Sequence, residues 1–142
     1  MKTFAFASLF TLSLLAGCSK GSPAAADHDH EHEHGPNGGH VVELTGGAGH
    51  MEVIHKKGVG EMELIFTKED EKTPLLIAAP LVFKVEQGKE WLEIAAAAVN
   101  PAEGKAATYR AAHEAFKQDH VHGRVTFVID GVTHNPELPE GH

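Results

Sequence analysis

The sequence predicts an all-β protein: a small antiparallel β-sandwich of about seven strands, preceded by a signal peptide and a disordered His-rich linker. Three observations predict this fold class. From Val41 onward, apolar and polar residues alternate in short runs. Turn-forming residues interrupt these runs at the spacing of about eight to twelve residues that is typical of sandwiches. No long segment has the apolar periodicity of an amphipathic helix.

Each alternating run predicts one strand, and turn residues predict the connections between them. Pro80 interrupts the longest apolar run, which predicts either two strands or one strand with a bulge. Residues 106–118 remain ambiguous, because their alanine content favours a helical turn while their position favours a further strand. Asp130-Gly131 predicts a tight hairpin turn. The predicted strands cover residues 40–44, 50–56, 61–67, 75–86, 91–99, 123–131 and 132–136.

The first seventeen residues have the pattern of a secretory signal peptide, with one basic residue followed by an apolar run. This run is shorter than the roughly twenty residues that a membrane-spanning helix needs. It ends in Leu15-Ala16-Gly17-Cys18, which resembles the lipobox of bacterial lipoproteins. The resemblance implies cleavage before Cys18, acylation of Cys18, and a lipid anchor in the bacterial cell envelope that faces the periplasm or the exterior. The alternative is an ordinary signal peptide with an incidental cysteine.

Charge and composition exclude several classes of function. The formal net charge is -8, and an acidic surface repels nucleic acid, so we expect no nucleic-acid partner. Cys18 is the only cysteine, which excludes a disulfide framework and a cysteine-ligated metal site. No Ser/His/Asp spacing, HExxH motif or paired-carboxylate motif stands out in the sequence. We therefore expect a protein that is not an enzyme.

A segment that alternates histidine with carboxylates, residues 27–34, dominates the predicted linker. Imidazole nitrogen binds copper, zinc and nickel, and the neighbouring carboxylates add negative potential. Because the segment lacks large apolar residues, we expect a mobile tether that binds metal with moderate affinity and fast exchange. The alternative is a solvating or pH-sensitive linker that binds no metal. The candidate ligands in this segment are His28, His30, His32 and His34.

Three further histidines are candidate ligands nearer to, or within, the predicted domain. His40 follows two glycines and could complete a site with the tether, or with His50 or His55 from the next strand. His120 and His122 repeat the alternate spacing, so in an extended chain both rings would lie on one face. The alternative for each is an exposed histidine at a strand end or in a loop.

The stretch "EHGPNGGHVVEL" at residues 33–44 resembles the HGPxGG segment near the N-terminal end of periplasmic adaptor subunits of heavy-metal efflux pumps. It is also similar to small His-rich bacterial lipoproteins, and "HGRVTFVIDG" at residues 122–131 fits the same pattern. The resemblance implies a small β-sandwich module for divalent-metal handling outside the cytoplasm, and it points to His34, His40 and His122. The sequence shows none of the coiled-coil hairpin, lipoyl-like and barrel domains of these adaptors, so we do not expect it to be a pump adaptor itself.

Together these observations predict four regions: a signal peptide at 1–17, a His/acid-rich tether at 18–40, a β-sandwich domain at 41–135 and a tail at 136–142. The expected function is capture, buffering or delivery of a divalent transition metal (copper, zinc or nickel), linked to a metal efflux or uptake system. The alternative is a protein-interaction module of an envelope or transport complex with a pH-sensitive histidine linker.

Overall fold

The computed structural model describes residues 34–139, and the predicted fold class is confirmed over this range. All strand pairs are antiparallel, and they form one sheet of nine strands. Two short 3-10 helices interrupt the strands, η1 (Lys57–Val59) and η2 (Glu114–Lys117). The strands are β1 (His40–Leu44), β2 (Gly49–Lys56), β3 (Glu61–Thr67), β4 (Ile77–Gln87), β5 (Glu90–Ala98), β6 (Lys105–Ala106), β7 (Thr108–Ala112), β8 (Gly123–Ile129) and β9 (Val132–His134).

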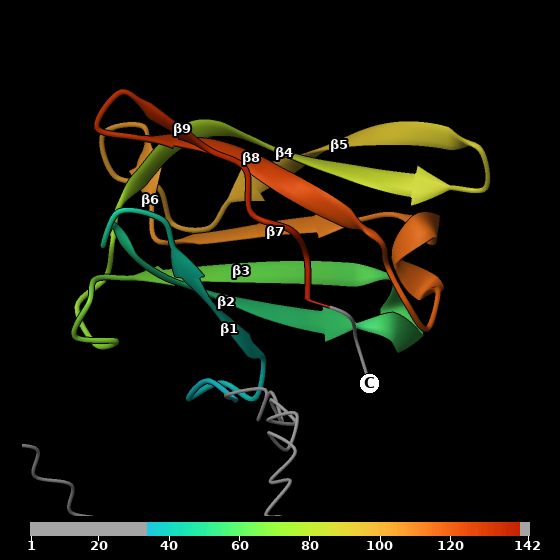
Figure 1. The fold of residues 1–142 in the computed structure, drawn as a ribbon, viewed down its shortest axis with the longest axis horizontal. Coiled ribbons are helices and arrows are strands. Elements are labelled where there is room, and N and C mark those ends of the chain that lie inside the picture. The colour runs from blue at the N-terminus through green and yellow to red at the C-terminus, as the bar shows by residue number, and fades with distance from the viewer. Residues whose placement is uncertain (1–33, 140–142) are drawn as a thin grey trace, which may run out of the picture. The chain divides into compact units, whose positions relative to one another are not determined.

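The strand order is β1-β2-β3-β7-β5-β4-β8-β9, with the two-residue strand β6 beside β4. One layer holds β1, β2, β3 and β7, and the other holds β4, β8 and β9 (Figure 1). Strand β5 joins the layers, because its first part pairs with β4 and its end at Ala97 and Ala98 pairs with β7. The sandwich is therefore a single sheet that folds over on itself. Its strand count exceeds the predicted seven because β6 is too short to give a clear sequence pattern and β7 lies in the segment that the sequence leaves ambiguous.

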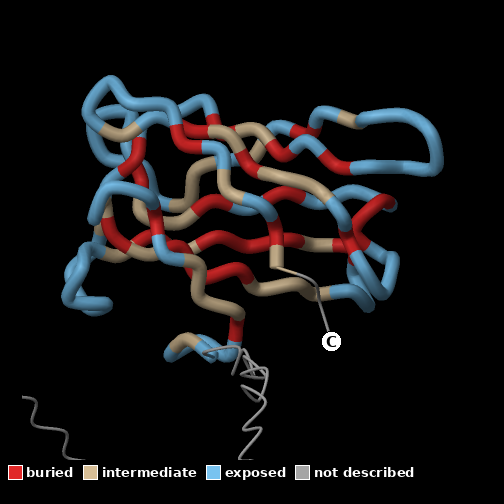
Figure 2. The backbone as a smooth tube through the Cα atoms, viewed as in Figure 1, coloured by how far each residue is buried: buried red, intermediate tan, exposed pale blue. Residues whose placement is uncertain are grey.

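The core lies between the two layers, where buried residues recur along the strands (Figure 2). Met62, Leu64 and Phe66 on β3 are at most 2% exposed, as their period-two spacing predicts. Aromatic side chains from both layers meet edge to face, as between Phe66 and Phe127, whose ring centroids lie 4.9 Å apart. The buried Tyr109 hydroxyl donates a hydrogen bond of 2.6 Å to the Ile77 carbonyl oxygen, so this polar group is satisfied inside the core.

Two ambiguous segments of the sequence are resolved. The interruption at Pro80 is a bulge within one strand, because the β4–β8 register shifts between Ala78 and Val82. Residues 106–118 contain both predicted alternatives, a strand (β7) followed by a single helical turn (η2). The predicted hairpin at Asp130-Gly131 is confirmed by the pairing of β8 with β9.

The predicted domain boundaries of 41 and 135 are too narrow. Residues 34–39 form a hydrogen-bonded turn before β1, with the Gly35 amide donating to the Gly39 carbonyl oxygen at 2.8 Å. At the other end, Leu138 is 6% exposed in the core, and its amide donates to the Gly123 carbonyl oxygen at 2.8 Å. The predicted signal peptide, Cys18 and residues 18–33 of the predicted tether lie outside the described residues. Within residues 34–139, no helix has the length and apolar character needed to cross a membrane.

Candidate metal site

The stretch His34-Gly35-Pro36-Asn37-Gly38-Gly39-His40 forms a tight hairpin turn. His34 and His40 pair across an antiparallel bridge, and the Gly38 amide donates to the Gly35 carbonyl oxygen at 3.0 Å. Pro36 occupies the second turn position, where its fixed backbone angle is favourable. Gly38 follows with φ of 81°, a left-handed conformation that glycine adopts without steric cost. Local backbone geometry thus accounts for Pro36 and Gly38.

A buried carboxylate on the neighbouring strand holds this turn in place. Glu52 on β2 is 5% exposed, and its Oε1 accepts hydrogen bonds from the backbone amides of Asn37 and Gly39, both at 2.9 Å. Its Oε2 accepts a third hydrogen bond from the Asn37 side-chain amide at 2.8 Å. A buried carboxylate is tolerated when its oxygens are hydrogen-bonded in this way, and such charge-assisted bonds are strong. Glu52 therefore fixes the turn against β2.

Glycine is required at two positions because the turn lies so close to Glu52. A Cβ atom on Gly39 would lie 2.5 Å from the Val53 carbonyl oxygen, and one on Gly35 would overlap the Glu52 carboxyl group. In contrast, a Cβ on Gly38 would meet nothing within 4 Å. The alternation of residues along this strand does not predict the role of Glu52. No sequence pattern identifies it, because the contact depends on the register that places Val41 opposite Glu52.

The turn brings two of the predicted ligands together. The imidazole rings of His34 and His40 have centroids 5.1 Å apart and are inclined by 40°. Two imidazoles bound to one tetrahedral ion, with metal–nitrogen bonds of about 2.0–2.1 Å, have centroids on the order of 5 Å apart. The spacing of the rings therefore suits a pair of ligands to one transition-metal ion. His34 is exposed and His40 is half-buried, so the pair is open to solvent on one side.

The pair alone does not complete a coordination shell. Within residues 34–139, no group of three or more histidine, cysteine, aspartate or glutamate side chains is arranged to hold a metal. His40 is in register with Val53 and not with either of the suggested partners, His50 and His55. His50 instead contacts the Lys68 carbonyl oxygen at 3.4 Å, and His55 Nε2 lies 2.5 Å from the Phe116 carbonyl oxygen. The two rings thus offer two ligands and leave the other metal positions open.

The second predicted pair, His120 and His122, has a different environment. His120 lies in a bend and His122 directly precedes β8, so neither residue belongs to a strand. Both are exposed, while Val121 between them is 6% exposed and packs into the core. Beside them, Asp119 pairs with Lys57, and this hydrogen bond lowers the pKa of the Asp119 carboxyl group. Val121 anchors this segment in the core, and the His122 carbonyl oxygen accepts a hydrogen bond of 2.9 Å from the Glu86 amide.

Two further histidines have structural roles. His113 caps η2, because its Nδ1 accepts a hydrogen bond of 3.1 Å from the Ala115 amide. His134 is 6% exposed and stacks on Phe127 with ring centroids 5.6 Å apart. His28, His30 and His32 lie outside the described residues, so their geometry stays a prediction.

On the same outer face as Glu52, a second carboxylate is held by ion pairs. Glu63 on β3 is 7% exposed and accepts hydrogen bonds of 2.8 Å from Lys56 and from Arg110. Burial raises the pKa of Glu63, but the hydrogen bonds from Lys56 and Arg110 together outweigh it, so the pKa lies below its ordinary value of 4.5. Lys56 also pairs with Glu61 at 2.7 Å. The charges on this face therefore neutralise one another.

The chain matches no family model, no curated protein and no solved structure. The candidate site consequently stands on its own geometry: a glycine turn, a buried carboxylate that fixes it, and two imidazoles at the spacing of a shared metal ion.

Proposed function

We propose that this protein captures transition-metal ions (copper, zinc or nickel) in the bacterial cell envelope, where lipid on Cys18 tethers it to a membrane. The observation that carries the proposal is the His34–His40 pair, with ring centroids 5.1 Å apart. The ion is the cargo of the protein and is handed on to an efflux or uptake system.

The position of the pair in the chain supports this proposal. His34 is both the last histidine of the alternating His/acid segment and one half of the pair. An ion bound by His28, His30 or His32 is thus only a few residues from two imidazoles held by a fixed turn. A site that keeps open positions exchanges its ligands readily, which suits an ion that is passed on. Carboxylates in the segment raise the local concentration of cations.

The test is a calorimetric titration of the full chain in detergent with Cu²⁺, Ni²⁺ and Zn²⁺. One variant carries His34→Ala and His40→Ala, and a second carries His28→Ala, His30→Ala and His32→Ala. We expect the first variant to lose the tightest site, with affinity falling at least about tenfold because an ion loses two imidazole ligands. We expect the second variant to bind fewer metal ions per chain but to retain the tightest site. Unchanged affinity in the first variant would refute the role of the pair.

The anchor is tested separately. Replacement of the proposed acylated residue, Cys18→Ser, removes the attachment point for lipid. We expect this variant to be released from the membrane fraction, whereas the parent chain remains bound after a high-salt wash. Release of both proteins by salt would show that the chain is held by charge and not by lipid.

A further inference from the structure

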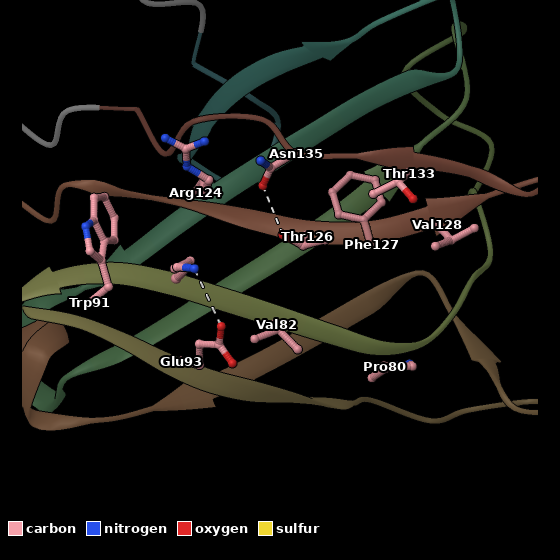
Figure 3. Close-up of a pocket in the computed structure, with 11 residues that line it drawn as sticks. Pro80, Val82, Trp91, Glu93, Arg124, Thr126, Phe127, Val128, Thr133 and Asn135 are labelled. Atoms are coloured by element: carbon pink, nitrogen blue, oxygen red, sulfur yellow. Dashed lines mark hydrogen bonds and ion pairs between the residues drawn. The ribbon is translucent and has the colours of Figure 1, made fainter.

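A groove of about 740 Å³ crosses the outer face of the layer that contains β5, β4 and β8 (Figure 3). This face is opposite to the core and is separate from the turn that carries His34 and His40. Side chains from three strands line the groove. They are Trp91 and Glu93 of β5, Val82 and Lys84 of β4, and Arg124 and Val128 of β8.

The floor of the groove exposes apolar surface. Trp91 is 51% exposed and Val128 is 43% exposed, and they are two of the five large apolar side chains exposed in the described part of the chain. Isolated exposed apolar residues are ordinary, but here both line one groove together with Val82. Tryptophan and arginine are the residues most enriched at the energetic centres of protein interfaces.

The groove also carries positive charge in a strongly acidic protein. Lys84 and Arg124 lie directly opposite each other on β4 and β8, and like charges in this arrangement repel. Lys84 Nζ is 3.7 Å from Glu93 Oε1, but both side chains are largely exposed, so this pair contributes little. The Arg124 guanidinium lies 5.9 Å above the Trp91 ring, and within residues 34–139 it forms no ion pair. An anionic group bound here would relieve the repulsion.

The outer face of the other layer shows that this charge arrangement is particular to the groove. There, Arg110 and Lys56 both pair with Glu63. The cations of that face share a buried carboxylate, whereas in the groove Lys84 has only the exposed Glu93 and Arg124 forms no ion pair within the described residues.

We propose that this groove binds an extended, acidic segment of a partner protein. Carboxylates of the segment contact Arg124 and Lys84, and an apolar side chain packs against Trp91 or between Val82 and Val128. An extended segment suits the groove because its alternate side chains point to the same side of the chain, about 6.8 Å apart, and can reach side chains from adjacent strands. The proposal is independent of the metal function, since no proposed ligand lines the groove.

The experiment uses Trp91, which is the only tryptophan in the chain and therefore reports on the groove alone. The probe is a short peptide in which leucine alternates with glutamate, added to the full chain in detergent with a chelator present. A matched peptide replaces glutamate with lysine. We expect the acidic peptide to shift Trp91 emission to shorter wavelength in a saturable manner, and added salt to weaken binding because exposed charges are screened.

Two variants test the charges. Arg124→Gln and Lys84→Gln should each weaken binding of the acidic peptide about tenfold, as expected when a hydrogen bond to a charged group is lost. Lys105→Gln, on the short strand β6 outside the groove, should bind as the parent does. Equal binding of the lysine peptide, or parent-like binding by both groove variants, would overturn the proposal. It would also be overturned if an oligomer of N-acetylglucosamine shifted Trp91 emission while the acidic peptide did not.

Discussion

Two pairs of histidines in this protein look alike in the sequence as candidate ligands, but the structure places them in unlike settings. His34 and His40 are six positions apart, and a turn brings their rings to 5.1 Å. His120 and His122 are two positions apart, yet the backbone between them is irregular and Val121 anchors it. The comparison teaches that spacing along the chain is a poor guide to a ligand pair. What matters is whether the backbone that carries the rings is itself fixed.

The largest expected effect concerns Glu52, which fixes that backbone. Glu52→Ala leaves the amides of Asn37 and Gly39 without their acceptor, and we expect a loss of about 2–4 kcal/mol in the free energy of unfolding. Metal affinity should fall as well, because the turn is released. Urea denaturation and calorimetry check the two effects. Glu52→Gln keeps one acceptor oxygen and should be milder, and parent-like behaviour of both variants would contradict the role of Glu52.

Next in size is a test of the glycine turn. Gly39→Ala forces a Cβ against the Val53 carbonyl oxygen, and overpacking of this kind costs about 1–3 kcal/mol. We expect lower stability and weaker metal binding, measured as for Glu52. Gly38→Asn is the matched control, since its side chain meets open space and asparagine tolerates positive φ. If both substitutions had equal effects, the close approach to β2 would be irrelevant.

The pH dependence separates loss of metal from loss of fold. Because the pKa of Glu63 is lowered in the folded state, its stabilising contribution is complete above the ordinary carboxyl pKa of 4.5 and is lost as the pH falls through the lower folded value. Histidine protonates near neutrality, at about pH 6.5. We therefore expect metal release on acidification to precede unfolding. Glu63→Gln should abolish part of the acid-induced loss in unfolding free energy, without a shift in the pH of metal release.

The smallest expected effect is at the second histidine pair. Replacement of His120 and His122 by alanine changes two exposed side chains, so stability should change by less than about 0.5 kcal/mol for each. Metal affinity at the tightest site should be unchanged. A loss of affinity comparable to that of the His34/His40 variant would remove the distinction between the two pairs.

Much of the fold is predictable from the sequence, because one face of most strands is buried and the period of two is visible. Phe66 and Val125 are both in the core, as their alternation predicts. The short strand β6 and the buried Leu138 are not predictable, since so few residues carry no period. They depend on pairing with β4 and Gly123 that only the folded chain provides.

The candidate site was predictable only in part. The His34 and His40 side chains stand out because of their residue type and the glycines between them. Glu52, which accepts hydrogen bonds from Asn37 and Gly39, does not stand out, because a glutamate in a strand usually faces solvent and here it is covered by the turn. The role of Glu52 depends on strand register, and register is set by the whole sheet rather than by neighbouring residues.

The most direct test of the central claim is an NMR titration of the isotope-labelled full chain with Zn²⁺ at neutral pH, followed through the ring signals of each histidine. We predict that the His34 and His40 rings respond together at the lowest metal concentrations, while the His120 and His122 rings do not move. Zinc binding that leaves the His34 and His40 signals unchanged would contradict the claim that this turn holds a metal ion.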